Sequence, residues 1–408
     1  MKKKVFSMSC LFPLTLGFLL ILHFHEARDS NLVGTYINGE YSNTIPSKND
    51  GYIIEKIVCD NETVGVWDEE NWGLQVTNLT KKSKCNVYFR TNQVNNIIKE
   101  LDTSGKCPSV NSDGSVNVTS AESENSLLCS APDNYGTSYY YRGNVTNNYV
   151  YFANIYWRII RINGDGTVRV IYDGTVAHAN GTANLDGGTG TVAFNDETND
   201  NAYVGYMYGN IGSSTYAETH ANINDSTIKK HIDNWYETNI LNTDFEQYIV
   251  DNTFCNDRSF SNDNPGTGFG DSPTFYRWTA WNSSELLLYC NQKNDSFTSR
   301  DLVNGNGKLK YPIALFSLDE VLLAGGWRNN NDTFYLNIGT YYWTMTPAAF
   351  FADKKAYIRD VFYTGMADRN NFTNNYELAR PVINLKPQAI MYGNGEMNNP
   401  YRLTSEIK

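Results

Sequence analysis

The stretch that decides the fold is NIYWRIIRINGDGTVRVIYDGT, residues 154–175, in which two apolar segments flank an Asn-Gly-Asp-Gly turn. Asn-Gly and Asp-Gly adopt the positive φ angles that tight hairpin turns need, so the stretch predicts a β-hairpin. Apolar residues fall on both faces of the first strand, which indicates a central hairpin covered on two sides. Arginine stems pack along aromatic rings while their guanidinium groups pair with carboxylates. We therefore predict a structural frame, and not a binding site, for the hairpin and its arginines Arg158, Arg161 and Arg169.

The composition predicts a β-rich protein with enough apolar residues for two or three domains. Hydrophobic residues make up 41% of the 408 positions and charged residues only 19%, which argues against wholesale disorder. Tyr, with 29 copies, and Asn are abundant, and these residues favour strands and polar loops respectively. The net charge of −11 would repel a phosphate backbone, so we do not expect a nucleic-acid partner.

The amino-terminal residues predict the compartment. Three lysines precede Val5 to His25, a stretch without acidic, Lys or Arg side chains that has the length of a membrane-spanning helix, about 20 residues. The residues before Arg28 fit a cleavage site poorly, so we favour an uncleaved anchor in residues 1–27 over a cleaved signal peptide. The basic end stays inside, so the remainder faces outward, as a single-pass cell-surface protein or a secreted one if cleavage occurs.

Six cysteines follow the apolar segment, and an even number in an outward-facing chain predicts disulfides. Metal ligation is the alternative, but no Cys-x-x-Cys or Cys/His cluster supports it, so we expect no metal at these residues. Sequence alone cannot choose among the many pairings of six cysteines. We predict the pairing of nearest neighbours, Cys59–Cys85, Cys107–Cys129 and Cys255–Cys290.

The pattern of strands and turns predicts an α+β chain with two folded domains. Residues 28–98 are predicted to form a stalk and a small immunoglobulin-like β-sandwich. Residues 99–135 carry little periodicity and are predicted to form a disulfide-pinned connector, or else the irregular start of the next domain. Residues 136–408 are predicted to form a larger β-rich domain with long loops. Its three expected helices begin at the capping residues Ser226, Thr243 and Ser317.

Catalytic and cofactor motifs are mostly absent from the sequence. It has no His-Glu-x-x-His or Gly-x-Ser-x-Gly motif, and the Gly-rich stretches 186–191 and 266–270 lack phosphate-loop spacing. We therefore predict no catalytic residue, no metal and no cofactor. The sequence leaves two alternatives open: a glycosidase carboxylate pair among the loop acids, and a weak calcium site, although the 12-residue loop signature is missing. The calcium alternative would use Asp196, Asp200, Asp263 and Asp271.

Two neighbouring stretches combine aromatic and amide side chains, Trp-Arg-Asn-Asn-Asn at residues 327–331 and Tyr-Tyr-Trp at residues 341–343. Aromatic rings offer rigid stacking area and Asn offers adaptable hydrogen bonds, a combination that carbohydrate-binding and protein-binding surfaces use. Core packing is the commoner role of any single aromatic residue. For the set, we predict a ligand-binding surface that consists of Trp327, Arg328, Asn330, Tyr342 and Trp343.

Five motifs occur in order along the chain: YWRIIRINGDGTVRVIYDGT, FCNDRS, ALFSLDEVLLAGG, YYWTMTP and ARPVINLK. Over residues 136–387 they resemble an uncharacterised surface-protein family of Gram-positive bacteria, the domain of unknown function 6273 family. That family is similar to the C-type-lectin-like fold of formylglycine-generating enzymes. The resemblance implies a lectin-like fold for residues 136–408 and no established activity. Formylglycine-generating enzymes use two reactive cysteines near the chain end, whereas this sequence has no cysteine after Cys290.

Three functions remain for a chain of this kind. We expect a non-catalytic protein at the cell surface, whose lectin-like domain binds a glycan or a host or cell-surface protein. The first alternative is a cell-envelope enzyme that acts on glycans through two carboxyl groups about 5–10 Å apart at the base of a cleft. The second is a structural component of the envelope without a ligand. Fold analogy alone cannot decide among them.

Overall fold

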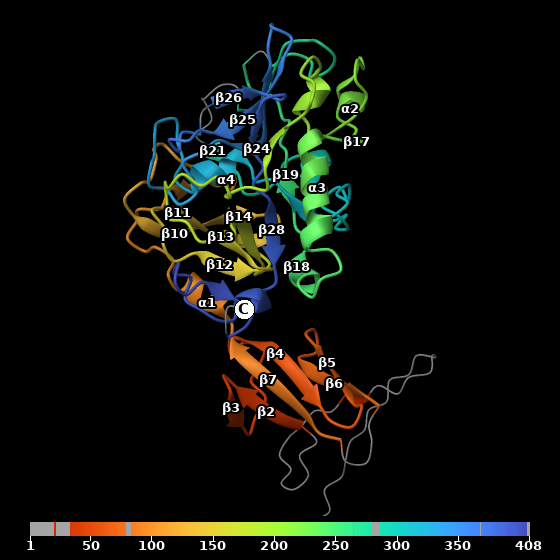
Figure 1. Cartoon of the computed structure of the whole chain (residues 1–408), viewed down its shortest axis with the longest axis vertical. Coiled ribbons are helices and arrows are strands. Elements are labelled where there is room, and N and C mark those ends of the chain that lie inside the picture. Colours follow the sequence, from red (N-terminus) through yellow and green to blue (C-terminus); the bar gives the residue numbers. More distant parts are fainter. Residues whose placement is uncertain are drawn as a thin grey trace, which may run out of the picture. The chain divides into compact units, whose positions relative to one another are not determined.

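The computed structural model of the chain describes residues 33–78, 83–263, 265–278, 285–367 and 369–405, and the backbone of Leu20–Ile21 (Figure 1). The predicted anchor, residues 1–27, otherwise lies outside the described residues. Among these ranges, no helix has the length and apolarity needed to cross a bilayer. The fold is β-rich, with 35% strand and 12% helix, which is compatible with the predicted mostly-β α+β class. The chain divides into two compact units, Met1–Thr91 and Asn92–Lys408.

The smaller unit consists of two β-sheets whose strands share one apolar core. Its strands are β1 (Leu20–Ile21), β2 (Val33–Ile37), β3 (Glu40–Ser42), β4 (Tyr52–Cys59), β5 (Val64–Asp68), β6 (Gly73–Thr77) and β7 (Cys85–Thr91). The sheet orders are β3-β2-β7-β4 and β1-β6-β5. Leu74 of β6 joins Val87 and Phe89 of β7 in the core. The disulfide between Cys59 and Cys85 links β4 to β7 directly across their shared register, and it confirms the first predicted pair.

The main sheet of the larger unit has the hairpin of residues 154–175 at its centre. Its strands are β10 (Ser126–Asp133), β11 (Gly136–Gly143), β12 (Tyr149–Phe152), β13 (Ile155–Ile162), β14 (Val168–Gly174), β18 (Ile249–Val250), β23 (Ile313–Ala314), β28 (Val382–Leu385) and β29 (Tyr401–Arg402). The main order is β10-β11-β13-β14-β28-β18. Trp157, Ile159 and Ile160 are all buried, so β13 is covered on both faces, as predicted. The segment 99–135 supplies β10, and it therefore belongs to this sheet.

A second, six-stranded sheet has the order β15-β27-β24-β25-β26, with β20 also paired to β24. Its strands are β15 (Thr191–Ala193), β20 (Thr274–Phe275), β24 (Tyr342–Phe350), β25 (Ala356–Val361), β26 (Arg369–Phe372) and β27 (Tyr376–Leu378). Every residue of β24 is buried. Short pairings involve β8 (Ser109–Val110), β9 (Val116–Asn117), β16 (Met207–Tyr208), β17 (Asn224–Asp225), β19 (Phe254–Cys255), β21 (Glu285–Leu286) and β22 (Ser296–Phe297). The other two predicted disulfides, Cys107–Cys129 and Cys255–Cys290, are confirmed in this unit.

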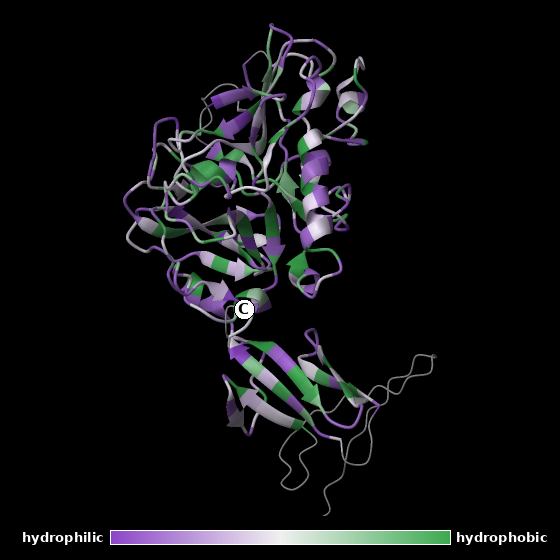
Figure 2. Ribbon diagram, viewed as in Figure 1, coloured by the Kyte–Doolittle hydropathy of each residue, from purple (hydrophilic) through white to green (hydrophobic). Residues whose placement is uncertain are grey.

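The helices of the described residues are short, apart from α3, which lies beside the main sheet in Figure 1. They are α1 (Gln93–Ile98), α2 (Tyr216–Thr219), α3 (Thr227–Asn239) and α4 (Leu318–Leu323), with 3₁₀ turns η1 (Asn201–Val204), η2 (Glu246–Tyr248), η3 (Lys293–Asp295) and η4 (Pro387–Ile390). The Ser226 hydroxyl accepts the N–H of Lys229, which confirms the predicted start of α3. Hydrophobic and hydrophilic residues both occur along α3 (Figure 2), because only one side faces the core.

The helix predicted to begin at Thr243 is wrong. The predicted capping pattern produces only the 3₁₀ turn η2, in which Glu246 accepts the backbone N–H of Asn242 at 2.8 Å. The chain leaves the turn at once, because Ile249 and Val250 form β18 and pair with β28 at the edge of the main sheet. Strand pairing with the sheet therefore overrides a local helix signal.

Candidate functional site

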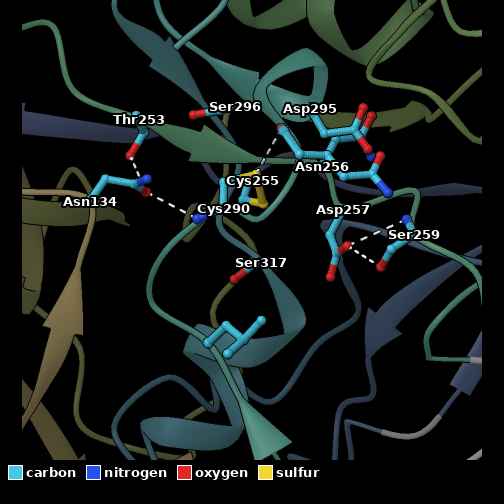
Figure 3. Close-up of a disulfide and its surroundings, with 12 residues drawn as sticks. Asn134, Thr253, Cys255, Asn256, Asp257, Ser259, Cys290, Asp295, Ser296 and Ser317 are labelled. Atoms are coloured by element: carbon cyan, nitrogen blue, oxygen red, sulfur yellow. Dashed lines mark hydrogen bonds between the residues drawn. A yellow bond between two sulfur atoms is a disulfide. The ribbon is translucent and has the colours of Figure 1, made fainter. Parts of the chain in front are cut away.

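A small cavity lies beside the Cys255–Cys290 disulfide (Figure 3), and its volume is about 20 Å³. Residues that surround the cavity are hydrogen-bonded to one another: the side chain of Asn134 accepts hydrogen bonds from the Thr253 hydroxyl and from the backbone N–H of Cys290. A cavity of this size holds about one water molecule and no larger ligand. It is lined by Asn134, Arg161, Arg169, Thr253, Cys255, Leu287, Leu288, Ser317 and Glu320.

Two of the hairpin arginines meet Glu320 at this cavity. Glu320 lies 2.6 Å from Arg169 and 3.3 Å from Arg161, which also pairs with Asp133 at 2.7 Å. Burial raises the pKa of Glu320, but the charges of Arg169 and Arg161 outweigh this effect and lower its pKa below the ordinary value. Glu320 also completes the predicted capping box of α4 with Ser317. The prediction of a structural frame is confirmed for these two arginines.

Arg158 differs from the other two arginines of the hairpin. It donates to the amide oxygens of Asn148 and Asn180 and to the backbone oxygen of Val145, and its guanidinium lies 3.8 Å from the ring centre of Tyr149. The expected carboxylate partner is therefore wrong for this residue. Amide and carbonyl oxygens satisfy its donors, which a buried arginine requires.

Two residues of the predicted ligand-binding surface are inside the protein. Tyr342 and Trp343 have no exposed area, because β24 is covered on both faces. The Tyr342 hydroxyl donates to the backbone oxygen of Leu336, and the Trp343 ring nitrogen donates to that of Val192. The prediction that these two side chains contact a ligand is wrong. Trp327, Arg328 and Asn330 do reach the surface, at least in part.

Three other aromatic rings adjoin this part of the surface. Tyr341 lies 4.8 Å from Phe362 and 5.5 Å from Tyr363, measured between ring centres, and Tyr363 is 47% exposed. The Thr364 hydroxyl donates to the Asn330 side chain at 2.7 Å, and the Ala367 N–H donates to the Trp327 backbone oxygen. These bonds join the two loops into one surface. We call it the aromatic surface, and it consists of Trp327, Arg328, Asn330, Tyr341, Phe362, Tyr363 and Arg369.

Arg369 is one of the two arginines of the aromatic surface. Its guanidinium carbon lies 4.8 Å from the ring centre of Tyr341 and 5.4 Å from that of Phe362. Behind these rings its Nε lies 2.8 Å from Asp360, and its Nη2 lies 2.6 Å from Glu377. The Arg369 side chain is 30% exposed, whereas the two acids are buried. The rings and the acids together fix the plane of the guanidinium group.

Asp360 and Glu377 are neighbouring buried carboxyl groups that both pair with Arg369. Burial raises the pKa of both groups, and the nearby charge of Asp360 raises that of Glu377 further. These shifts favour the protonated form of Glu377, which reduces the negative charge beside Asp360. Two-carboxyl glycosidases place their acids about 5–10 Å apart at a cleft that the substrate enters, whereas Asp360 and Glu377 are both buried. This pair does not fit the enzymatic alternative.

Replacing Glu377 with glutamine is expected to weaken the pH dependence of stability. Folded Glu377 holds a proton that the unfolded chain has lost at neutral pH, so folding takes up a proton. The raised pKa thus makes stability fall as pH rises above the ordinary carboxyl range, by up to about 1.4 kcal/mol per pH unit. Glutamine does not titrate, so E377Q loses this slope. Urea unfolding between about pH 6.5 and pH 9 measures it.

Glu218→Gln is the control for that experiment. Hydrogen bonds from Ser213 and Thr215 lower the pKa of Glu218, so it is ionised in both states throughout this pH range. The control should retain the slope of the wild-type protein. If the unfolding free energies of E377Q and the wild type change equally with pH, the prediction is contradicted, because Glu377 then releases its proton in the folded state.

Sequence reasoning missed Tyr341, Phe362, Tyr363 and Arg369. Tyr341 directly precedes β24 and is partly exposed, whereas every residue of β24 itself is buried. Arg369 and Glu377 lie close in sequence, on β26 and β27, but no local motif predicts their contact. In the part of the chain that the structure describes, no group of three or more His, Cys, Asp or Glu side chains could hold a metal ion. Comparisons of the chain with protein-family models, curated proteins and solved structures find no match.

Proposed function

We propose that this chain is an outward-facing binding protein, anchored by residues 1–27 or secreted, whose larger unit holds a glycan or protein ligand without catalysis. The binding site is the aromatic surface. A lectin-like fold of the larger unit is part of the proposal. Three disulfides support an oxidising compartment, because such bonds persist there.

The observation that carries the proposal is the exposure of Tyr363 beside Tyr341, Phe362 and Arg369. Aromatic and arginine side chains are enriched where proteins bind other molecules, and they contribute most of the binding energy there. Arg369 lies in β26, and Tyr341 and Phe362 directly adjoin β24 and β25, so the sheet positions the backbone next to these side chains. A ligand-free structural component would need no such cluster.

The double variant Tyr341→Ala and Tyr363→Ala is expected to lower ligand affinity at least about tenfold, because it removes stacking area. The full chain would be applied to arrays of glycans and of extracellular proteins, and the affinity for each positive ligand measured by titration. Tyr41→Ala is the matched control, since Tyr41 is a 54% exposed tyrosine of the smaller unit. Failure of the wild-type chain to bind any array member would contradict the proposed function.

A further inference from the structure

His220 is a fully buried histidine whose hydrogen bonds fix its protonation state. Its Nδ1 lies 3.1 Å from Nη1 of Arg258, and its Nε2 lies 2.8 Å from the backbone oxygen of Gly268. A guanidinium nitrogen can only donate a hydrogen bond, and a carbonyl oxygen can only accept one. Nδ1 therefore carries no proton and Nε2 carries one, so the ring is neutral. A second ring proton would point at the N–H groups of Arg258.

The ionisable groups closest to the His220 ring already have partners or stay uncharged. Asp295 is paired with Arg258, since one of its oxygens accepts from the guanidinium group and the other from the backbone N–H of that residue. The rings of Tyr216 and Tyr276 lie 4.3 Å and 6.3 Å from the His220 ring, measured between ring centres. Burial raises the pKa of both phenols above the ordinary value, so they carry no charge.

Two further carboxylates of the neighbouring segments are also paired. Asp257 forms an ion pair with Arg277 at 2.5 Å, and Glu218 of α2 accepts hydrogen bonds from two hydroxyl groups. The glycine-rich loop, residues 266–270, contains no ionisable side chain. Protonation of His220 would therefore place two adjacent cations beside one carboxylate in the protein interior, which is costly.

The contact between His220 and Arg258 joins α2 to the rest of the larger unit. His220 is the C-terminal capping residue of α2, and the Tyr216 hydroxyl at its other end donates to the backbone oxygen of Arg258 at 2.9 Å. Nη2 of Arg258 also donates to the side chain of Asn222, just after the helix. Within α2 only Thr219 is buried. Segments with few buried side chains open locally at a lower free energy than the whole chain unfolds.

We propose that His220 is an acid-sensitive switch, whose protonation below neutral pH separates α2 from Arg258 and from the glycine-rich loop. While the segment is closed, burial and the charge of Arg258 lower the pKa of His220 well below its ordinary value of 6.5. Opening exposes the ring to water, where it binds a proton near that ordinary value. The open form therefore gains stability as pH falls below about 6.5, and its population rises by up to about tenfold per pH unit. This switch does not depend on the proposed function, because its residues lie outside the aromatic surface.

The test compares the full wild-type chain with His220→Gln by amide hydrogen exchange. A glutamine amide can accept from Arg258 and donate to Gly268, but it does not titrate. Peptides that cover residues 216–222 and 266–270 would be followed by mass spectrometry between about pH 7 and about pH 5, above the ordinary range of carboxyl groups. Intrinsic exchange rates cancel in the ratio of the two chains at each pH. Opening of the wild type relative to H220Q is expected to rise at least about tenfold as pH falls across this range.

His231→Gln is the matched control, because His231 is a partly buried histidine of α3 that is hydrogen-bonded to Thr189. This variant should keep the acid response of the α2 peptides. An equal pH dependence of exchange in the wild type and in H220Q would overturn the proposal. Loss of the response in H231Q would overturn it too, since the proton would then act at another histidine.

A second measurement, on the wild type alone, decides the matter if H220Q does not fold. Nitrogen NMR of the chain with labelled histidine reports the proton on each ring nitrogen. His220 is expected to show a neutral ring with its proton on Nε2 for as long as the amides of α2 remain protected from exchange. A doubly protonated His220 in a chain whose α2 amides stay protected would contradict the proposal.

Discussion

Glu320→Ala is expected to lower the free energy of unfolding by about 3–5 kcal/mol, the cost of breaking a buried ion pair from one side. Arg161 would keep its partner Asp133, but Arg169 would keep only uncharged oxygen acceptors. Burial lowers the pKa of Arg169 to about 10 even with Glu320 present, which indicates how strongly the site disfavours an unpaired cation. Urea unfolding followed by tryptophan fluorescence measures the change.

Glu320→Gln separates the charge of this residue from its capping role. Glutamine can still accept the Ser317 N–H, so it preserves the capping box of α4 while it removes the negative charge. We expect this variant to lie between the wild type and E320A. Glu237→Gln is the control, because Glu237 forms an exposed ion pair with Lys310, and such pairs contribute little to stability. A change of less than about 1 kcal/mol in the unfolding free energy of E320A would contradict the prediction. Water would then hydrate the arginines after the substitution, and the ion pairs of Glu320 would not be what holds the hairpin.

The predictable parts of the fold are those with a local physical cause. The central hairpin follows from an Asn-Gly-Asp-Gly turn between apolar segments, and α3 and α4 follow from capping residues that satisfy the first N–H groups of each helix. The disulfide pairing was predicted from sequence proximity, and all three pairs are confirmed. Each of these signals lies within a few tens of residues.

The parts that could not be predicted depend on contacts between distant segments. Tyr341 lies just before β24 and is partly exposed, whereas Trp343 lies inside the strand and is buried. The failed helix at Thr243 became an edge strand because β28, more than a hundred residues later, offered unpaired backbone groups. The aromatic surface includes Trp327, Arg328 and Asn330 of the predicted set. Arg369 could not be predicted for it, because this residue reaches the aromatic rings only through the sheet that β24, β25 and β26 form.

The double variant Cys255→Ala and Cys290→Ala is expected to lose about 3–4 kcal/mol of unfolding free energy, as loop-closure entropy predicts for a sequence separation of 35 residues. The bond joins β19 to the residues that line the cavity at Glu320 and Arg169. Without the bond, the unfolded chain gains conformational entropy. The folded chain also loses a covalent link beside the ion pairs of Glu320. Chemical unfolding of the variant and of the wild type, both without reductant, measures the difference.

The corresponding variant of Cys59 and Cys85 is the control for this experiment, since that pair closes a loop of similar length in the smaller unit. Loop-closure entropy alone predicts losses that differ by less than about 0.5 kcal/mol for the two variants. Because each unit has its own core, the two losses should appear in different parts of the unfolding curve. If both variants shift the same transition, the units unfold together and the bond at Cys255 does not act on the larger unit alone. If neither variant is less stable than the wild type, the bonds do not form in the native protein, and the oxidising compartment on which the binding proposal depends loses its main support.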